Sequence, residues 1–192
     1  MITAHNLSKR FGTKRVFERV DIALVTGDSL LVTGPNGSGK TTLLRVLAGL
    51  AAPSGGELEL PTRNRIGYLG HEPLVYRELT PLENLALFGR LYRVAEARER
   101  TGMLLERFGL WDVRHQRVST FSRGMQQRLA LCRVLLHDPH LLLLDEPFNA
   151  LDADGAALLD RALDELADRT LVVATHDPGR VERLATQRLA FA

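Results

Sequence analysis

The chain has one cysteine and few lysines, although its 192 residues are otherwise of ordinary composition. Cys132 has no second cysteine to pair with, so no internal disulfide can form and a reducing compartment is expected. The lysines are limited to Lys9, Lys14 and Lys40, whereas Lys and Arg together number 25. A lysine that is kept in so arginine-rich a chain therefore stands out, and Lys40 does so most clearly.

Long apolar runs and an excess of charge are missing as well. No run approaches the ~18 apolar residues of a membrane-spanning helix, and the first residues lack the apolar segment of a signal peptide, so we expect neither. The 25 basic residues are opposed by 23 acidic ones, for a net charge of +2, which argues against a nucleic-acid-binding surface. At roughly 150 residues per domain, the length predicts one domain over 1–192, with room for a subdomain.

Strand-like runs alternate with helical patterns at both ends of the chain, and the middle is helical. Strands are predicted over 29–33, 141–144 and 171–174, the last two of them buried, and helices over 84 to about 100 and over 153–168. Apolar strands that alternate with helices are typical of an α/β fold with a mostly parallel sheet covered on both faces. The helices in the middle are predicted to form an insertion into that fold.

Residues 34–41, Gly-Pro-Asn-Gly-Ser-Gly-Lys-Thr, lie between a predicted strand and a predicted helix. This spacing is that of a phosphate-binding loop. Its glycines let backbone N–H groups turn toward a phosphate, and the helix N-terminus adds its positive dipole end. Lys40 is expected to reach the outer phosphates, Thr41 to hold Mg²⁺, and Thr42 to donate a further hydrogen bond. The candidate nucleotide-binding residues here are Gly34, Pro35, Asn36, Gly37, Ser38, Gly39, Lys40, Thr41 and Thr42.

The leucine run 141–144 leads directly into Asp145 and Glu146. In open parallel sheets, ligands bind at the carboxyl ends of the strands, which is where these two carboxylates are predicted to lie. Asp145 is expected to hold Mg²⁺ through water. Glu146 is expected to orient or deprotonate the attacking water as a general base. A phosphate-bearing ligand with Mg²⁺ is therefore expected here.

The segment Phe121-Ser122-Arg123-Gly124-Met125-Gln126-Gln127-Arg128, together with the loop and strand above, resembles the ATP-binding-cassette (ABC) ATPases. The resemblance covers essentially the whole chain. It implies a P-loop NTPase fold with a mostly parallel sheet, an N-terminal antiparallel β subdomain and an inserted helical subdomain. It also implies a nucleotide-binding core of about residues 1–80 and 137–192 and a helical signature subdomain of about residues 81–136.

The family resemblance further implies a head-to-tail dimer, in which the signature residues of one subunit contact the nucleotide held by the other. The implied signature residues are Ser122, Arg123, Gly124, Met125 and Gln126, and the implied dimer-loop residues are Asn149, Leu151 and Asp152. Glu146, His176 and Lys40 are the implied catalytic residues, with His176 matching the switch histidine. Phe11 matches the aromatic residue that stacks on adenine; packing into the core is the alternative.

Two motifs depart from the family pattern, the signature and the segment that carries His71. Arg123 replaces the usual glycine of the signature, and Met125 replaces its usual glutamine. Arg123 either neutralises phosphate charge or is a surface charge at the start of a helix, and we favour the surface charge. His71 replaces a glutamine that touches Mg²⁺ and the attacking water. Because Mg²⁺ prefers oxygen ligands, His71 is expected to act through water, and a His71 without contact is the alternative.

The segments Gly70–Pro73 and Asp145–Asp152 look like those of the haem-exporter ATP-binding subunit of bacterial cytochrome c maturation. The signature looks more like those of drug and polysaccharide exporters. Either resemblance implies an ATPase, peripheral on the cytoplasmic face of the inner membrane, that drives separate permease subunits docked near residues 80–100. A soluble ABC ATPase that acts on nucleic acid or ribosomes is the alternative from another class. Such proteins usually carry two cassettes or a long coiled-coil insertion, and this chain has neither.

Overall fold

A computed structural model describes residues 2–166 and 168–191 of the chain. The chain divides into two units. The first comprises residues 1–71, 140–146 and 167–192, and the second comprises residues 72–139 and 147–166. Residues 1, 167 and 192, which the sequence analysis included in the expected domain, lie outside the described residues.

The first unit contains a three-stranded antiparallel sheet in the order β2-β1-β4. Its strands are β1 (Ile2–Phe11), β2 (Lys14–Leu24) and β4 (Gly55–Glu59). The turn between β1 and β2 is short, so Phe11 pairs directly with Lys14. This sheet is the antiparallel β subdomain that the resemblance implied.

The second sheet of the first unit is parallel and has the strand order β5-β6-β7-β3-β8. Its strands are β3 (Ser29–Thr33), β5 (Ile66–Leu69), β6 (Leu141–Asp145), β7 (Thr170–Thr175) and β8 (Gln187–Ala190). Both β6 and β7 are buried along their whole length, which explains their apolar sequences. Because the strands are parallel, their carboxyl ends meet at one edge, and the predicted α/β fold is confirmed.

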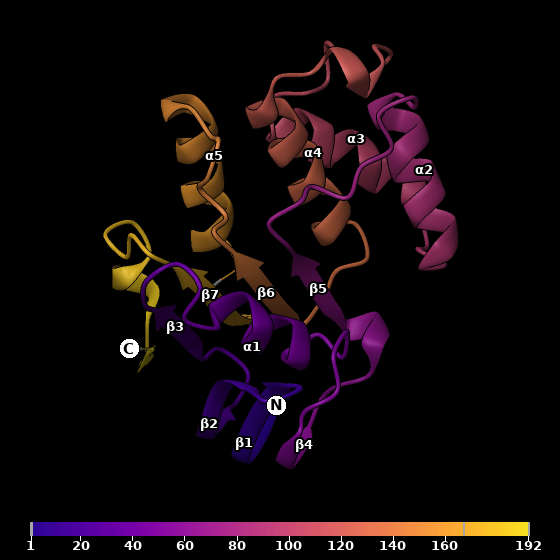
Figure 1. Cartoon of the computed structure of the whole chain (residues 1–192). Helices are drawn as coiled ribbons and strands as arrows, with labels where there is room; N and C mark the ends of the chain where they lie inside the picture. The colour runs from indigo at the N-terminus through magenta and orange to yellow at the C-terminus, as the bar shows by residue number, and fades with distance from the viewer. Residues whose placement is uncertain (1, 167, 192) are drawn as a thin grey trace. The chain divides into compact units, whose positions relative to one another are not determined.

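Helix α1 (Lys40–Leu47) follows β3 and lies between the two sheets (Figure 1). Its buried side chains join those of both sheets in one hydrophobic core. Members from α1 are Leu43, Leu44, Val46 and Leu47. Two short 3₁₀ segments, Arg63–Arg65 and Glu182–Leu184, complete the first unit. The core thus fixes the start of α1 relative to the strand ends that carry the site.

The second unit is helical, with α2 (Pro81–Leu91), α3 (Ala97–Arg107), α4 (Arg123–Leu135) and α5 (Ala153–Asp164), and a 3₁₀ turn at Val118–Thr120. Helix α2 begins with a capping box in which Thr80 and Glu83 exchange hydrogen bonds, and Pro81 occupies its first position. Inside this unit the amide of Asn84 bonds to the backbone of Tyr76 and Thr80. The loop before α2 is therefore tied to the helix.

The prediction of one helix from 84 to about 100 is wrong. Helix α2 ends at Leu91, and α3 begins at Ala97. Between them Arg93 and Glu96 have φ values of 53° and 54°, in the left-handed region that no right-handed helix passes through. The helix predicted over 153–168 ends at Asp164, and its residue 167 lies outside the described residues.

Candidate active site

The loop between β3 and α1 turns at three glycines with positive φ, and two of them have no room for a side chain. Gly34, Gly37 and Gly39 have φ values of 148°, 83° and 114°. A Cβ on Gly34 would lie 2.7 Å from the Phe191 carbonyl oxygen, and one on Gly39 would lie 2.9 Å from Cγ1 of Val16. Glycine at both positions therefore lets the loop pass close to β8 and β2 while its backbone makes the tight turn.

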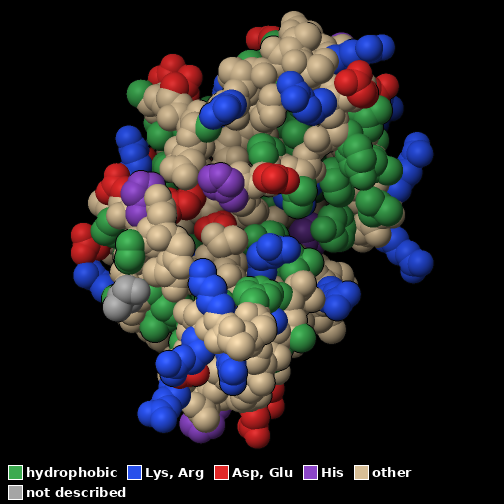
Figure 2. Space-filling view, viewed as in Figure 1, with side chains coloured by type: hydrophobic (Ala, Val, Ile, Leu, Met, Phe, Trp, Pro, Cys, Tyr) green, Lys and Arg blue, Asp and Glu red, His purple; other side chains and the backbone are tan. Residues whose placement is uncertain are grey.

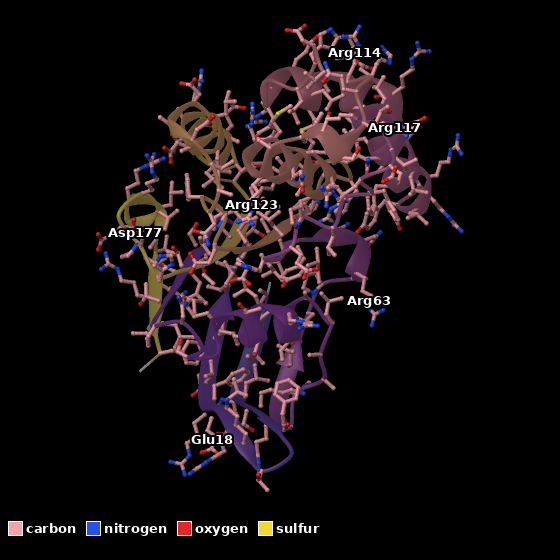
Figure 3. The ribbon with its side chains drawn as sticks, turned by 45° about the horizontal axis from the view of Figure 1, so that its top comes forward. Glu18, Arg63, Arg114, Arg117, Arg123 and Asp177 are labelled. Carbon is pink, nitrogen blue, oxygen red and sulfur yellow. The ribbon has the colours of Figure 1, made fainter. Side chains whose placement is uncertain are left out.

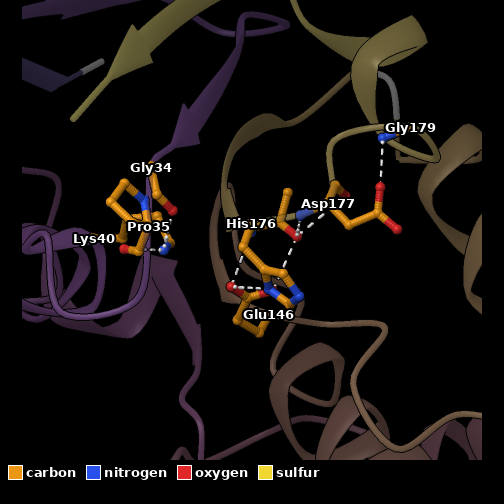
Figure 4. A network of polar contacts seen from close by, with 8 residues as sticks. Gly34, Pro35, Lys40, Glu146, His176, Asp177 and Gly179 are labelled. Carbon is orange, nitrogen blue, oxygen red and sulfur yellow. Dashed lines mark hydrogen bonds and ion pairs between the residues drawn. The ribbon is translucent and has the colours of Figure 1, made fainter. Parts of the chain in front are cut away.

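Lys40 is the first residue of α1, and its side chain is only 5% exposed. Its Nζ donates hydrogen bonds to the carbonyl oxygens of Gly34, at 2.7 Å, and Pro35, at 3.0 Å (Figure 4). An ammonium has three donors, so one remains for a phosphate oxygen. The Ser38 hydroxyl in the same loop is buried without a hydrogen-bond partner in the described chain. The loop therefore has both the positive charge and the spare donors that suit a phosphate.

Asp145 ends β6 and is 2% exposed. Burial raises the pKa of its carboxyl group, the nearby Thr41 hydroxyl lowers it, and the charge of Glu146 raises it again. His71 and Lys40 lower this pKa to a smaller extent, so both lie near the carboxylate. Neither carboxylate oxygen has a hydrogen-bond partner among the described residues. A buried carboxylate of this kind is costly unless a cation shares its site.

The surroundings of Asp145 fit Mg²⁺. This ion takes oxygen ligands and is typically held by one or two carboxylates together with water and substrate phosphates. Asp145 and the Thr41 hydroxyl supply such oxygens. Among the residues the structure describes, no group of three or more His, Cys, Asp or Glu side chains could hold a metal alone. The further ligands of Mg²⁺ here would therefore be phosphate and water oxygens.

Glu146 lies at the centre of a hydrogen-bond network at the ends of β6 and β7 (Figure 4). Its Oε1 accepts a bond from the His176 backbone N–H at 3.0 Å and lies 2.9 Å from Nδ1 of the same residue. Its Oε2 accepts a bond from the Thr175 hydroxyl at 2.9 Å. The backbone of Glu146 has a φ of 48°, held by a bond from its N–H to the Ala174 carbonyl. The network thus fixes both oxygens of the carboxylate.

The contact between Glu146 and His176 also restricts the proton on the imidazole. Because an ionised carboxylate only accepts hydrogen bonds, Nδ1 must carry a proton in this arrangement. A neutral ring then presents Nε2 as an acceptor, and a doubly protonated ring presents it as a donor. Donation from Nε2 of His176 to a phosphate therefore requires the imidazolium form.

The ring of Phe11 is 59% exposed, so it does not belong to the core. Phe11 pairs with Lys14 on β2, and Val16, two residues farther along β2, touches Gly39 of the phosphate loop. Two residues of a strand span about 7 Å. Phe11 is therefore an exposed aromatic surface beside the phosphate loop, within the same unit.

The signature residues lie in the second unit, at the start of α4. Ser122 caps this helix, its Oγ accepting a bond from the Met125 N–H at 3.2 Å, and Gln126 bonds to the Phe121 carbonyl. Arg123 is exposed at the first position of α4 (Figure 3) and has no hydrogen bond or ion pair within the described chain. The Ser122 hydroxyl is thus hydrogen-bonded at the start of α4, whereas the Arg123 guanidinium is exposed to solvent.

The predicted dimer-loop residues also lie in the second unit, where they adjoin the signature. A Cβ on Gly124 would lie 2.9 Å from the Ala150 carbonyl oxygen, so only glycine permits this contact. Ala150 has a φ of 65°, Asn149 is exposed, and Leu151 is half-buried. Asp152 caps α5 by accepting a bond from the Gly155 N–H at 2.8 Å. The signature and the dimer loop therefore share one surface.

Residues 17–149 match the model of a known family, described as ABC transporter. The chain belongs to this family. It is 43% identical, over 84% of its length and 76% of the relative, to the cytochrome c biogenesis ATP-binding export protein CcmA of Cupriavidus necator. It is 38% identical, over 94% of its length and 66% of the relative, to the daunorubicin resistance ATP-binding protein DrrA3 of Streptomyces coeruleorubidus.

A solved dimer of an ATP-binding cassette in a post-hydrolysis state with ADP and Pi has the same fold. It superposes with a TM-score of 0.88 at 27% identity, covering 100% of this chain and 94% of that one. The chain is thus an ATP-hydrolysing subunit of an ABC transporter, of a kind that binds ATP and dimerises with transmembrane partners. Within the described residues, no helix is long and apolar enough to cross a membrane.

Two residues of the ABC ATPase site were missed in the sequence. Thr175 bonds to Glu146. Burial raises the pKa of the Tyr68 phenol, and the carboxylate charge of Asp145 raises it further, so Tyr68 lies close to Asp145. Thr175 directly precedes His176 at the end of a predicted strand, so its position was a usable signal. Tyr68 gave none, because its approach to Asp145 depends on the pairing of β5 with β6.

Proposed function

We propose that this ABC ATPase binds MgATP in a head-to-tail homodimer and drives separate permease subunits in haem export or handling during cytochrome c maturation. The haem role is supported by the 43% identity to the cytochrome c biogenesis export protein. The place of work would be the cytoplasmic face of the plasma membrane, where the chain would be peripheral. The observation that carries the hydrolytic function is the network around Glu146, beside the buried Asp145 and the phosphate loop.

The phosphate chain of ATP would bind to residues 34–42, with the third donor of Lys40 on an outer phosphate. Mg²⁺, when bound by Asp145 and Thr41, supplies charge neutralisation of the phosphates. A carboxylate offers about four acceptor sites, and three of those on Glu146 are occupied by Thr175 and His176. The remaining one can accept a hydrogen bond from the attacking water. Glu146 would then take the proton of that water, while His176 holds the carboxylate in place. His71 would act near Asp145 through water.

The second active-site half would come from the partner subunit. Ser122, Gly124 and their neighbours in the signature would face the nucleotide held by the other copy. The tight contact of Gly124 with Ala150 supports a joint role of the signature and the dimer loop in that interface. Arg123 adds a positive charge to this surface. No nucleic acid is expected as a partner, since the net charge is only +2.

The permease would dock on the second unit. Figure 2 shows hydrophobic side chains gathered over α2. An apolar groove of about 400 Å³ between α2 and α3 is lined by Leu82, Ala86, Gly89, Arg90, Ala97, Arg98 and Thr101. Leu91 and Tyr92 are exposed close by. The apolar floor and the two arginines suit an amphipathic helix of the permease that carries an acidic residue.

Drug export is the second candidate function, supported by the similarity to the daunorubicin resistance protein. Deletion of the gene in its own host tests the haem role against drug export. We expect loss of covalently bound haem from c-type cytochromes on haem-stained gels, restored by the wild-type gene and not by Glu146→Gln. Unchanged haem staining together with greater sensitivity to daunorubicin would overturn the haem role and favour the exporter. The Glu146→Gln gene provides the control, because its product retains the fold and the docking surface.

A further inference from the structure

Lys9 makes two contacts that the hydrolytic site does not use. Its Nζ lies 4.8 Å from the centroid of the Phe11 ring, and it donates a hydrogen bond to the Ala52 carbonyl oxygen at 2.6 Å. Lys9 and Phe11 both belong to β1, and Ala52 belongs to the loop that precedes β4. All three lie in the first unit. The ammonium is therefore held between a fixed carbonyl and one face of an exposed aromatic ring.

The loop that carries Ala52 is itself bound to β1. The Ser54 N–H donates to the Ser8 carbonyl at 2.8 Å, and the Ser54 Oγ accepts from the Arg10 N–H at 3.0 Å. Gly56 has a φ of 84°, and a Cβ there would clash with the Asn6 carbonyl oxygen, so glycine permits this close approach. These bonds flank Lys9 on β1. The carbonyl that anchors its ammonium is thus part of a rigid frame.

We propose that Lys9 is a positioning residue for the purine base of ATP: its ammonium covers one face of Phe11 and leaves the opposite face as the stacking platform. This inference rests on the proposed function and on the match of Phe11 to the aromatic residue that stacks on adenine in the ABC ATPases. An exposed aromatic side chain loses rotational freedom when a ligand stacks on it, and a ring that is already held loses less. A cation on one face also withdraws negative charge from the ring, which favours an electron-rich purine on the other face.

The residue type fits this role. Lys9 is one of only three lysines in the chain, among 25 basic residues. Its ammonium is a compact charge with three donors on a flexible stem, so it can bond to the Ala52 carbonyl and still lie over the ring. Lys14, which pairs with Phe11 across the strands, is exposed and has no ring contact within the described chain. The two lysines therefore carry the same charge and lie two and three residues from Phe11 in the sequence, but only Lys9 contacts the ring within the described chain.

The test compares the Kd values of the full chain for ATP and for inorganic tripolyphosphate, both with Mg²⁺. Lys9→Ala is expected to raise the Kd for ATP about three- to five-fold, the range of an exposed cation–π contact, and to leave the Kd for tripolyphosphate unchanged. Lys9→Arg should restore most of the ATP affinity. Lys14→Ala is the matched control and should leave the Kd values for ATP and for tripolyphosphate unchanged.

A double-mutant cycle separates positioning from a general effect on charge or stability. In a Phe11→Leu chain, Lys9→Ala should have no further effect on the Kd for ATP. Equal weakening of ATP and tripolyphosphate by Lys9→Ala, or no weakening of either, would overturn the role of Lys9. If Phe11→Leu still weakens ATP alone in that case, the proposed base platform survives without Lys9. If Phe11→Leu changes neither Kd, the placement of the nucleotide beside Phe11 is itself wrong.

Discussion

The two units hold their candidate functional side chains in opposite ways. In the first unit the carboxylate network lies at the ends of parallel strands, where Glu146 bonds to Thr175 and His176. In the second unit candidate side chains lie at helix starts and bond to their own backbone, as Ser122 does at α4 and Asp152 at α5. Strand register therefore sets the geometry of the first group, and helix capping sets that of the second. The candidate hydrolytic residues thus lie in the first unit, and the candidate signature and dimer-loop residues lie in the second.

The sharpest test of this division is Glu146→Gln, which changes the network of the first unit and nothing in the second. Loss of the general base should lower the rate of ATP hydrolysis by roughly 10²–10⁴-fold, because an amide cannot take the proton of water. Binding of ATP should persist, and sedimentation with ATP and Mg²⁺ should show a dimer. A variant that hydrolyses ATP at the wild-type rate would remove Glu146 from the chemistry.

A smaller change in the same network serves as its control. Thr175→Val removes one of the three hydrogen bonds to Glu146 and keeps the volume of the side chain. Hydrolysis should fall by about ten-fold, in line with one lost hydrogen bond to a charged group. A fall as large as that of Glu146→Gln would mean that Thr175 does more than hold the carboxylate.

Lys40→Ala tests whether the phosphate loop binds through its buried ammonium. Removal of a charged hydrogen-bond donor should weaken ATP roughly 10- to 150-fold in a titration with a fluorescent nucleotide. The far-ultraviolet circular dichroism spectrum should be unchanged, since α1 keeps its buried leucines. Unaltered affinity for ATP in a folded Lys40→Ala protein would contradict the assigned role.

Asn84 of the second unit is expected to affect stability rather than chemistry. Asn84 is 1% exposed and makes three hydrogen bonds to the backbone of Tyr76 and Thr80, so Asn84→Ala should cost about 1–3 kcal/mol of unfolding free energy. Denaturant titration measures the loss, and hydrogen exchange should localise it to α2. The exposed Asn64 of the first unit is the control, with an expected change within about 0.5 kcal/mol for Asn64→Ala. Equal losses of unfolding free energy for Asn84→Ala and Asn64→Ala would contradict the stabilising role of the Asn84 hydrogen bonds.

The smallest expected effect concerns pH and the start of α2. Hydrogen bonds from the Thr80 backbone N–H and then its hydroxyl lower the pKa of Glu83. A lowered pKa in the folded chain means that the ionised carboxylate favours folding. This contribution is complete above the unfolded pKa of about 4.3 and is lost as the pH falls through the lower folded value. Glu83→Gln should therefore melt earlier than the wild type at pH 7, and the two melting temperatures should converge near pH 3; a constant difference would contradict the assignment.

The parts that could be predicted from the sequence are those with a local signal. The glycine spacing of residues 34–41 predicted the turn between β3 and α1, and the apolar run before Asp145 predicted a buried strand that ends there. The Thr80–Glu83 spacing is that of a capping box, and α2 begins with one. In each case the residues that make the structure are neighbours in the chain, so short-range chemistry is sufficient.

The parts that could not be predicted depend on distant residues or on unmarked backbone. The break between α2 and α3 contains neither glycine nor proline, and its two left-handed residues are Arg93 and Glu96, which are common in helices. The contact of Tyr68 with Asp145 needs the register of β5 on β6. The contact of Lys9 with Phe11 is fixed by Ala52, which no spacing within β1 indicates.

The lone cysteine has a practical consequence. Cys132 is fully buried in α4, its Sγ donates to the Leu104 carbonyl at 3.4 Å, and burial raises the pKa of the thiol well above its usual value. Thiol-modifying reagents attack the thiolate of an accessible cysteine, so we expect them not to label Cys132 in the folded chain. A single cysteine placed at exposed Asn149 would then be the one reactive thiol of each copy. A fluorophore there would report the meeting of two subunits without any need to remove the natural residue.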